Sequence, residues 1–227
     1  NQGQSMLVPG SDYISAGIDF LLQVENGKNA RMLVDSYYDS FYYMYGHKLA
    51  MVEEQEYADK KDNGIFHPIR LTLNKELTVE NEKGEKQIVP FDSYETGILR
   101  SGNSNPNEEN FDSLTDFYLN EEEGLLEVRI PWALLNVKDP GQREVMGDMW
   151  TDNGLESSAW VDGVRIGAIA VSNSDGNVVD SFPKTVNGKS RQEDYFLYRW
   201  EKWEMPTYYE RLKQSYYRIQ KLFSEME

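Results

Sequence analysis

The chain has 227 residues, of which 39 are acidic and 23 are basic, and its formal net charge of −16 excludes DNA or RNA as a ligand because polyanions are repelled. Because cysteine is absent, disulfides, thiolate catalysis and cysteine-based zinc sites are excluded as well. No segment approaches the ~20 consecutive apolar residues that span a bilayer, so we expect no membrane insertion by this chain.

Strand patterns recur along the first half of the chain with turn patterns between them, which is typical of an all-β sandwich or barrel. The first predicted strands are residues 19–24 and 31–35, joined through the hairpin-type turn Asn26-Gly27. The next predicted strand covers residues 69–79, and a turn at 81–85 leads from it into residues 87–91. Its alternating apolar residues share one face: Leu71, Leu73, Leu77 and Val79.

Residues 125–130 form the clearest strand pattern of the sequence. Val128 and Ile130 share one face, and Pro131 must end the strand or lie at a sheet edge because proline cannot donate to a ladder. Trp132 follows at once. Residues 114–119 are predicted to pair with this strand through the acidic turn at 121–124, as a β-hairpin.

The second half contains further predicted strands at residues 164–171, 178–182 and 195–200, with a turn at Asp175-Gly176. Two stretches show no hydrophobic periodicity. Residues 101–113 are rich in Asn and Glu and are predicted to form an exposed loop. For residues 136–159 we expect a long connection with one short helix.

The C-terminal segment is predicted to be an amphipathic helix. Thr207-x-x-Glu210 forms a capping box after Pro206. Five apolar residues then fall on one face: Leu212, Tyr216, Ile219, Leu222 and Phe223. We therefore expect one sandwich domain over residues 1–206, with a helix over 207–227 docked on it; the alternative is that the helix joins a partner.

Few motifs for catalysis are present. His47 and His67 lack zinc-type spacing, and no G-x-S-x-G elbow or phosphate-binding glycine loop occurs. Paired carboxylates can hydrolyse glycosides, but with so many acidic residues the sequence does not single out a pair. We expect no enzyme, with glycoside hydrolysis kept as an option.

Two acidic residues are candidates for a structural calcium ion. Asp148 and Asp152 lie close together before the turn Asn153-Gly154, and calcium prefers oxygen-rich loops. The spacing does not fit an EF-hand, because no glutamate occupies the last position of such a loop. No other cofactor is expected.

Aromatic residues give a better indication of binding. Sugars stack on aromatic faces and bond to neighbouring carboxylates, so we predict glycan contacts at Trp150 and Trp160, in irregular polar sequence, and at Tyr42 and Asp39, in a tyrosine-rich segment. The alternative is core packing, since tryptophan is usually largely buried. For Trp132 and Trp200 we favour the core.

The quoted strands together resemble a known fold family. Asp12-Tyr13 leading into residues 19–24, then residues 32–36, then Glu127-Val128-Arg129-Ile130-Pro131-Trp132, resemble the DOMON-like domains, and among them the family 9 carbohydrate-binding modules. The residues from Tyr198 to Tyr216 are also similar to the tail of large exported proteins of Firmicutes. The resemblance implies an immunoglobulin-like antiparallel β-sandwich. The paired tryptophans that clamp the sugar in that family have no match here, and neither histidine has the context of a haem ligand.

Two main hypotheses for function follow. In the first, the chain is a non-catalytic module that binds a polysaccharide or other glycan, within a larger extracellular or cell-surface bacterial protein. In the second, it is a structural or interaction domain that positions a neighbouring domain of the parent polypeptide and has no small-molecule ligand. Because the chain starts at Asn1, we expect it to belong to such a longer polypeptide.

Overall fold

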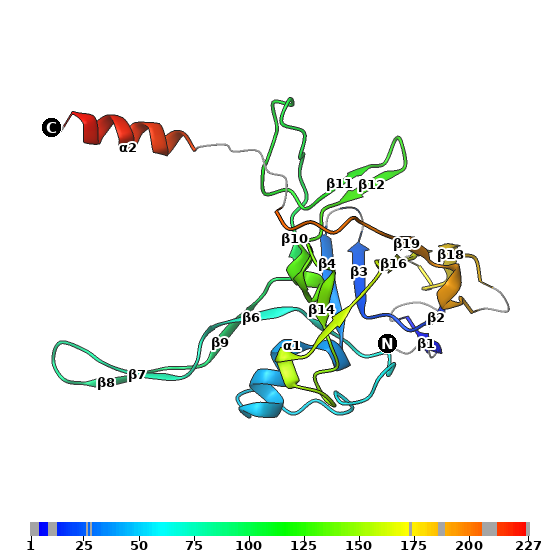
Figure 1. The fold of residues 1–227 in the computed structure, drawn as a ribbon, viewed down its shortest axis with the longest axis horizontal. Coiled ribbons are helices and arrows are strands. Elements are labelled where there is room, and N and C mark those ends of the chain that lie inside the picture. Colours follow the sequence, from blue (N-terminus) through cyan, green and yellow to red (C-terminus); the bar gives the residue numbers. More distant parts are fainter. Residues whose placement is uncertain are drawn as a thin grey trace.

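The computed structural model describes residues 5–8, 13–25, 27, 29–172, 174–185, 189–205 and 213–225. The chain is mainly β, with several antiparallel sheets and a C-terminal helix (Figure 1). Several residues used in the sequence analysis lie outside these ranges: Asp12, Asn26, Pro206, Thr207, Glu210 and Leu212.

The central sheet consists of β3 (Phe20–Glu25), β4 (Asn29–Asp35), β5 (Phe66–Pro68) and β10 (Ile98–Leu99). All of its pairings are antiparallel, and β4 pairs with the other three strands. The β3–β4 hairpin has the predicted position, with Gly27 at a positive φ of 62° in its turn. Positive φ is accessible to glycine without steric cost, which suits this tight connection.

The main hydrophobic core lies against this sheet. The predicted hairpin forms from β11 (Phe117–Asn120) and β12 (Leu125–Val128), and a short 3-10 helix, η3 (Trp132–Leu135), follows Pro131. The residues of the core are buried or half-buried and come from β3, β4, β10, the position between β5 and β6, and the segment from β11 to η3: Phe20, Leu22, Val24, Ala30, Met32, Ile69, Leu99, Phe117, Val128, Ile130, Leu134 and Leu135. The face that Val128 and Ile130 were predicted to share therefore packs against the core.

A long β-arm leaves the central sheet (Figure 1). It is built from β6 (Arg70–Asn74) paired with β9 (Asp92–Glu95), and from β7 (Leu77–Glu80) paired with β8 (Lys86–Val89). We use "the arm" for residues 70–95. The predicted alternation is present, but its apolar side faces solvent, since Leu71 and Leu73 are 56% and 59% exposed.

The region expected to be an irregular connection, residues 136–159, contains a small sheet instead. It comprises β13 (Val137–Asp139), β14 (Glu144–Met146) and β15 (Ser158–Trp160), and the expected short helix is η4 (Gly154–Glu156). Strands of three residues are too short to show a periodicity of two, which explains why the sequence pattern missed them.

The predicted strand at 164–171 is split by Gly167. Its first part, β16 (Val164–Ile166), pairs with β19 (Phe196–Tyr198), whereas β17 (Ala168–Val171) pairs with β18 (Val178–Phe182). A Cβ atom on Gly167 would lie 2.5 Å from the Tyr195 ring, so only glycine fits there.

The remaining elements lie near the chain ends. They are β1 (Ser5–Leu7) paired with β2 (Ile14–Ala16), a 3-10 helix η5 (Gln192–Asp194), and α2 (Gln214–Ser224). None of the helices in the described part of the chain is long and apolar enough to cross a membrane.

Contrary to the expectation from its sequence, helix α2 does not pack on the sheets. Every described residue of α2 is exposed, including Tyr216, Ile219, Leu222 and Phe223, and the helix stands apart from the sheets in Figure 1. An amphipathic pattern shows that one face can be covered, but it does not specify which surface covers it.

Candidate functional site

The tyrosine-rich segment is helical, not a strand. It forms η1 (Ser36–Tyr38), α1 (Ser40–Tyr42) and the π-helical η2 (Tyr43–Lys48). Asp35 caps η1 by accepting a 2.9 Å hydrogen bond from the Tyr37 amide, and Asp39 caps α1 by accepting a 3.0 Å bond from the Tyr42 amide. Asx side chains at such positions satisfy the free amides of a helix start.

Both capping carboxylates are buried, and this changes their protonation. Asp35 and Asp39 are 0% and 4% exposed. Burial raises the pKa of each to about 6, partly offset by the capping amides, because a charged carboxylate is poorly solvated inside the protein. Asp39 and the 5% exposed Tyr42 therefore stabilise the start of α1 and do not line an open surface.

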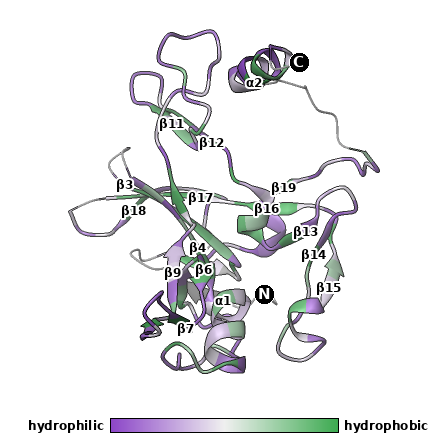
Figure 2. Cartoon of the chain, turned by 90° about the vertical axis from the view of Figure 1, so that its left-hand side faces the viewer, coloured by the Kyte–Doolittle hydropathy of each residue, from purple (hydrophilic) through white to green (hydrophobic). Residues whose placement is uncertain are grey.

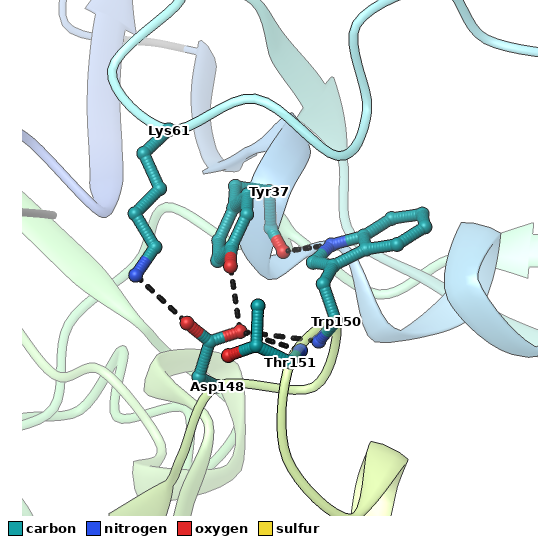
Figure 3. Close-up of polar contacts among 5 residues, drawn as sticks. All are labelled: Tyr37, Lys61, Asp148, Trp150 and Thr151. Atoms are coloured by element: carbon teal, nitrogen blue, oxygen red, sulfur yellow. Dashed lines mark hydrogen bonds and ion pairs between the residues drawn. The ribbon is translucent and has the colours of Figure 1, made fainter.

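Five residues from three separate parts of the chain meet beside η1 (Figure 3). The Tyr37 hydroxyl donates a 2.6 Å hydrogen bond to Asp148 Oδ1, and Lys61 Nζ lies 2.7 Å from Asp148 Oδ2. The Trp150 indole nitrogen donates a 3.0 Å bond to the Tyr37 carbonyl. The amides of Trp150 and Thr151 also donate to Asp148 Oδ1. We call this group the Asp148 cluster: Tyr37, Lys61, Asp148, Trp150 and Thr151.

Aromatic rings surround the same tryptophan. The ring centroid of Trp150 lies 5.2 Å from that of Tyr43 and 4.9 Å from that of His47. The Lys61 ammonium lies 5.0 Å from the Tyr37 ring centroid, within cation–π range. Trp150 is half-buried, so these contacts leave part of its surface open to solvent.

The electrostatics of the cluster favour a charged Asp148. Burial acts to raise the pKa of Asp148, but hydrogen bonds from Lys61, Tyr37 and Thr151 outweigh it and hold that pKa well below its usual range. Burial and the hydrogen bond to Asp148 raise the pKa of Tyr37, so its hydroxyl stays protonated and donates.

The calcium candidates occupy different environments. Both Asp148 oxygens already have protein partners, and the exposed Asp152 contacts that residue through its backbone amide, which donates a 3.0 Å bond to the Asp148 carbonyl. Among the described residues, no three His, Asp or Glu side chains are grouped so that they could hold a metal ion. The two side chains are thus not brought together as cation ligands.

Trp160 is exposed, unlike the buried Asp39 and Tyr42 of the predicted glycan site. It is 67% exposed at the end of β15 and pairs across the sheet with Glu144 on β14. Directly opposite residues of an antiparallel pair project from the same face, so an indole ring and a carboxylate share this surface. Trp132 and Trp200, for which a core position was favoured, are half-buried and pack together with ring centroids 4.7 Å apart.

A hollow that the sequence did not single out lies between the irregular loop and the β11–β12 hairpin. It measures about 260 Å³. Tyr118 and Glu127 are directly opposite each other on β11 and β12 and contribute one wall. The lining residues are Asn103, Ser104, Asn105, Glu108, Tyr118 and Glu127. The signal for this site was the Asn- and Glu-rich composition of residues 101–113.

Comparison with known proteins adds no family to this geometry. The chain matches no protein-family model, no curated protein and no solved structure.

Proposed function

We propose that this chain is a structural interaction domain that holds another folded domain in place through the apolar face of its arm. The main support for this proposal is the burial pattern of β6, in which the apolar side chains face solvent and the polar ones do not. Leu71 and Leu73 are exposed, whereas the polar residues Arg70, Thr72 and Asn74 are half-buried. Contiguous exposed apolar surface of this kind marks sites of protein association.

Polar contacts fix the orientation of β6. Arg70 donates to the Ser93 hydroxyl at 3.1 Å through Nε, and its guanidinium lies 5.9 Å from the Phe41 ring centroid. A slip of one residue would break these contacts while turning the leucines over. The exposed position of Leu71 and Leu73 is thus maintained by specific interactions on the other face.

The total surface agrees with an interaction role. The chain exposes 16105 Å². A compact monomer of 26.3 kDa exposes about 11,000 Å² by the usual scaling of surface with mass. The excess is several times the area of about 800 Å² that each partner buries in a standard interface.

We also propose a fold family and a location for the chain. The packing of the β3–β4 sheet against Val128 and Ile130 supports an immunoglobulin-like sandwich of the DOMON-like type. A binding module of that type would act outside the cell or at the cell surface, beside other domains of the parent polypeptide.

Substitutions on the arm test the interaction role. We expect Leu71→Ser with Leu73→Ser to weaken association with the neighbouring domain in the longer polypeptide, measured by limited proteolysis and by size in solution. Ile88→Ser is a matched control, because Ile88 is 64% exposed on β8 and lies on the face opposite Leu77. Equal behaviour of the two variants would contradict the proposal.

Glycan binding is a second candidate, favoured by the hollow beside Tyr118. Its lining combines a tyrosine ring, asparagine amides and two carboxylates, the groups that stack on and hydrogen-bond to sugars. We expect Tyr118→Ala to reduce retention on a polysaccharide affinity column, with Tyr94→Ala on the arm as control. If neither the unaltered chain nor the Tyr94 variant is retained on any cell-wall polysaccharide, this candidate is excluded.

A further inference from the structure

A second unpartnered apolar surface lies on α2. Tyr216, Ile219 and Phe223 recur at helical spacing on one face, beside Leu222, and these four side chains are between 48% and 63% exposed. Figure 2 shows hydrophobic and hydrophilic residues on different sides of this helix. Among the described residues, α2 and the arm thus each present an exposed apolar face, and α2 does not cover the arm of its own chain.

We propose that α2 of one copy lies on the β6–β9 face of a second copy, and that a two-fold pair repeats this contact twice. This inference rests on the proposed function, since it takes the apolar face of the arm as the binding surface and assigns that surface a second copy of the chain. With both contacts formed, two chains make a closed two-fold dimer, which is the commonest symmetry of homo-oligomers.

The charges of the two surfaces are complementary. Residues 213–225 carry three basic side chains, Lys213, Arg218 and Lys221, and one acidic side chain, Glu225. The arm, by contrast, carries six acidic and four basic side chains, in a chain whose net charge is −16. A basic helix is attracted to an acidic arm, whereas two acidic surfaces repel each other, so the charges favour contact between α2 and the arm.

The two surfaces also match in length. An α-helix rises 1.5 Å per residue, so the 11 residues of α2 span about 16 Å. Strand β6 has five residues, which at 3.4 Å each span about 17 Å. One helix therefore covers one β6–β9 ladder.

The contact area is sufficient for a stable pair. Leu71, Leu73 and Tyr94 on the arm, like the four apolar residues of α2, expose roughly half of their surface. At on the order of 100 Å² for each half-exposed side chain, one contact buries ~700 Å² of apolar area. Two contacts bury ~1,400 Å², within the range of about 1,200–2,000 Å² for specific interfaces.

Size in solution tests the pair. We expect a dimer of the unaltered chain by light scattering, and a dissociation constant raised at least about tenfold by Leu71→Ser with Leu73→Ser, or by Ile219→Ser with Phe223→Ser. Tyr217→Ser and Ile88→Ser are controls and leave the dimer intact, because Tyr217 lies away from the apolar face of α2 and Ile88 lies on β8. All of these side chains are exposed, so folding of the variants is checked simply by circular dichroism.

Mixing the two double variants distinguishes the arm–helix contact from pairing of like surfaces. Each double variant alone retains no complete contact, whereas the mixture retains one intact arm and one intact helix. We expect more dimer in the mixture than in either separate sample at the same total concentration. If the arm variant alone stays dimeric, the helices pair with each other and the inference is overturned.

Because the chain contains no cysteine, disulfide trapping has no background. Under mild oxidation we expect a chain with Leu73→Cys to cross-link to a second chain with Leu222→Cys, and to cross-link much less to one with Tyr217→Cys. A monomer at every concentration, or equal cross-linking of both helix positions, would overturn the inference. If L71S/L73S still weakens binding of the neighbouring domain in that case, the proposed function stands without it.

Discussion

The Tyr37 hydroxyl donates a 2.6 Å hydrogen bond to the Asp148 carboxylate across 111 residues of sequence. This bond joins the helical segment after β4 to the loop after β14. Lys61, from a third region of the chain, forms an ion pair with the other oxygen of the same carboxylate. The Asp148 cluster therefore ties together parts of the chain that belong to different sheets. We expect these contacts to stabilise the fold around Trp150.

Tyr37→Phe removes this hydrogen bond and leaves the ring in place. Because a hydrogen bond to a charged group contributes about 1.5–3 kcal/mol, we expect the free energy of unfolding to fall by about 2 kcal/mol, measured by urea denaturation. Tyr57→Phe is the control, since Tyr57 is 59% exposed. An unchanged unfolding midpoint for Tyr37→Phe would show that the cluster does not stabilise the fold.

The buried Asp39 predicts a dependence of stability on pH. Its pKa of about 6 lies above the unfolded value of about 3.9. The folded state thus binds more protons between these values, and stability falls as pH rises from about 4 to above 6. A difference of about two units corresponds to about 3 kcal/mol.

Asp39→Asn keeps a good helix cap but does not titrate. We therefore expect this variant to lose less stability than the unaltered chain between pH 4.5 and pH 7.5, by about 2 kcal/mol in urea denaturation. Asp152→Asn, at an exposed position, should follow the unaltered chain. Parallel pH profiles for Asp39→Asn and the unaltered chain would contradict burial as the cause.

Local patterns predicted the parts of the fold that depend on neighbours in sequence. The hairpins β3–β4 and β11–β12 were found because alternation and a turn occur together within a few residues. The helical start at Asp35 had a signal that was missed. Asp35-Ser36 and Asp39-Ser40 are repeated Asx-Ser pairs of the kind that begin helical turns.

The contacts of the Asp148 cluster could not be predicted from the sequence in the way that the hairpins could. Trp150 donates to the Tyr37 carbonyl from 113 residues away, and no local pattern encodes such a contact. The outward orientation of Leu71 and Leu73 was hidden for a different reason. Alternation shows that two faces differ, but it does not show which face meets the core.

Calcium is predicted to have little effect on stability. Because Lys61 already pairs with Asp148 at 2.7 Å, a cation must displace an ammonium group to reach that carboxylate. We expect the melting temperature to differ by less than about 1 °C between millimolar CaCl₂ and EDTA, measured by scanning calorimetry. A ligand at 100 times its Kd adds about 2.7 kcal/mol, so a clear upward shift would reveal a site.

The core around Phe117 provides the last prediction. Phe117 is 1% exposed and packs among residues from the central sheet and from η3. Phe117→Ala leaves a cavity and is expected to cost about 3–5 kcal/mol of unfolding free energy, measured by chemical denaturation. Phe196→Ala removes the same side chain where it is 56% exposed, and should cost far less. Equal losses for the two variants would mean that the contacts of Phe117 do not form the main core, and that the surface of β19 is covered in solution.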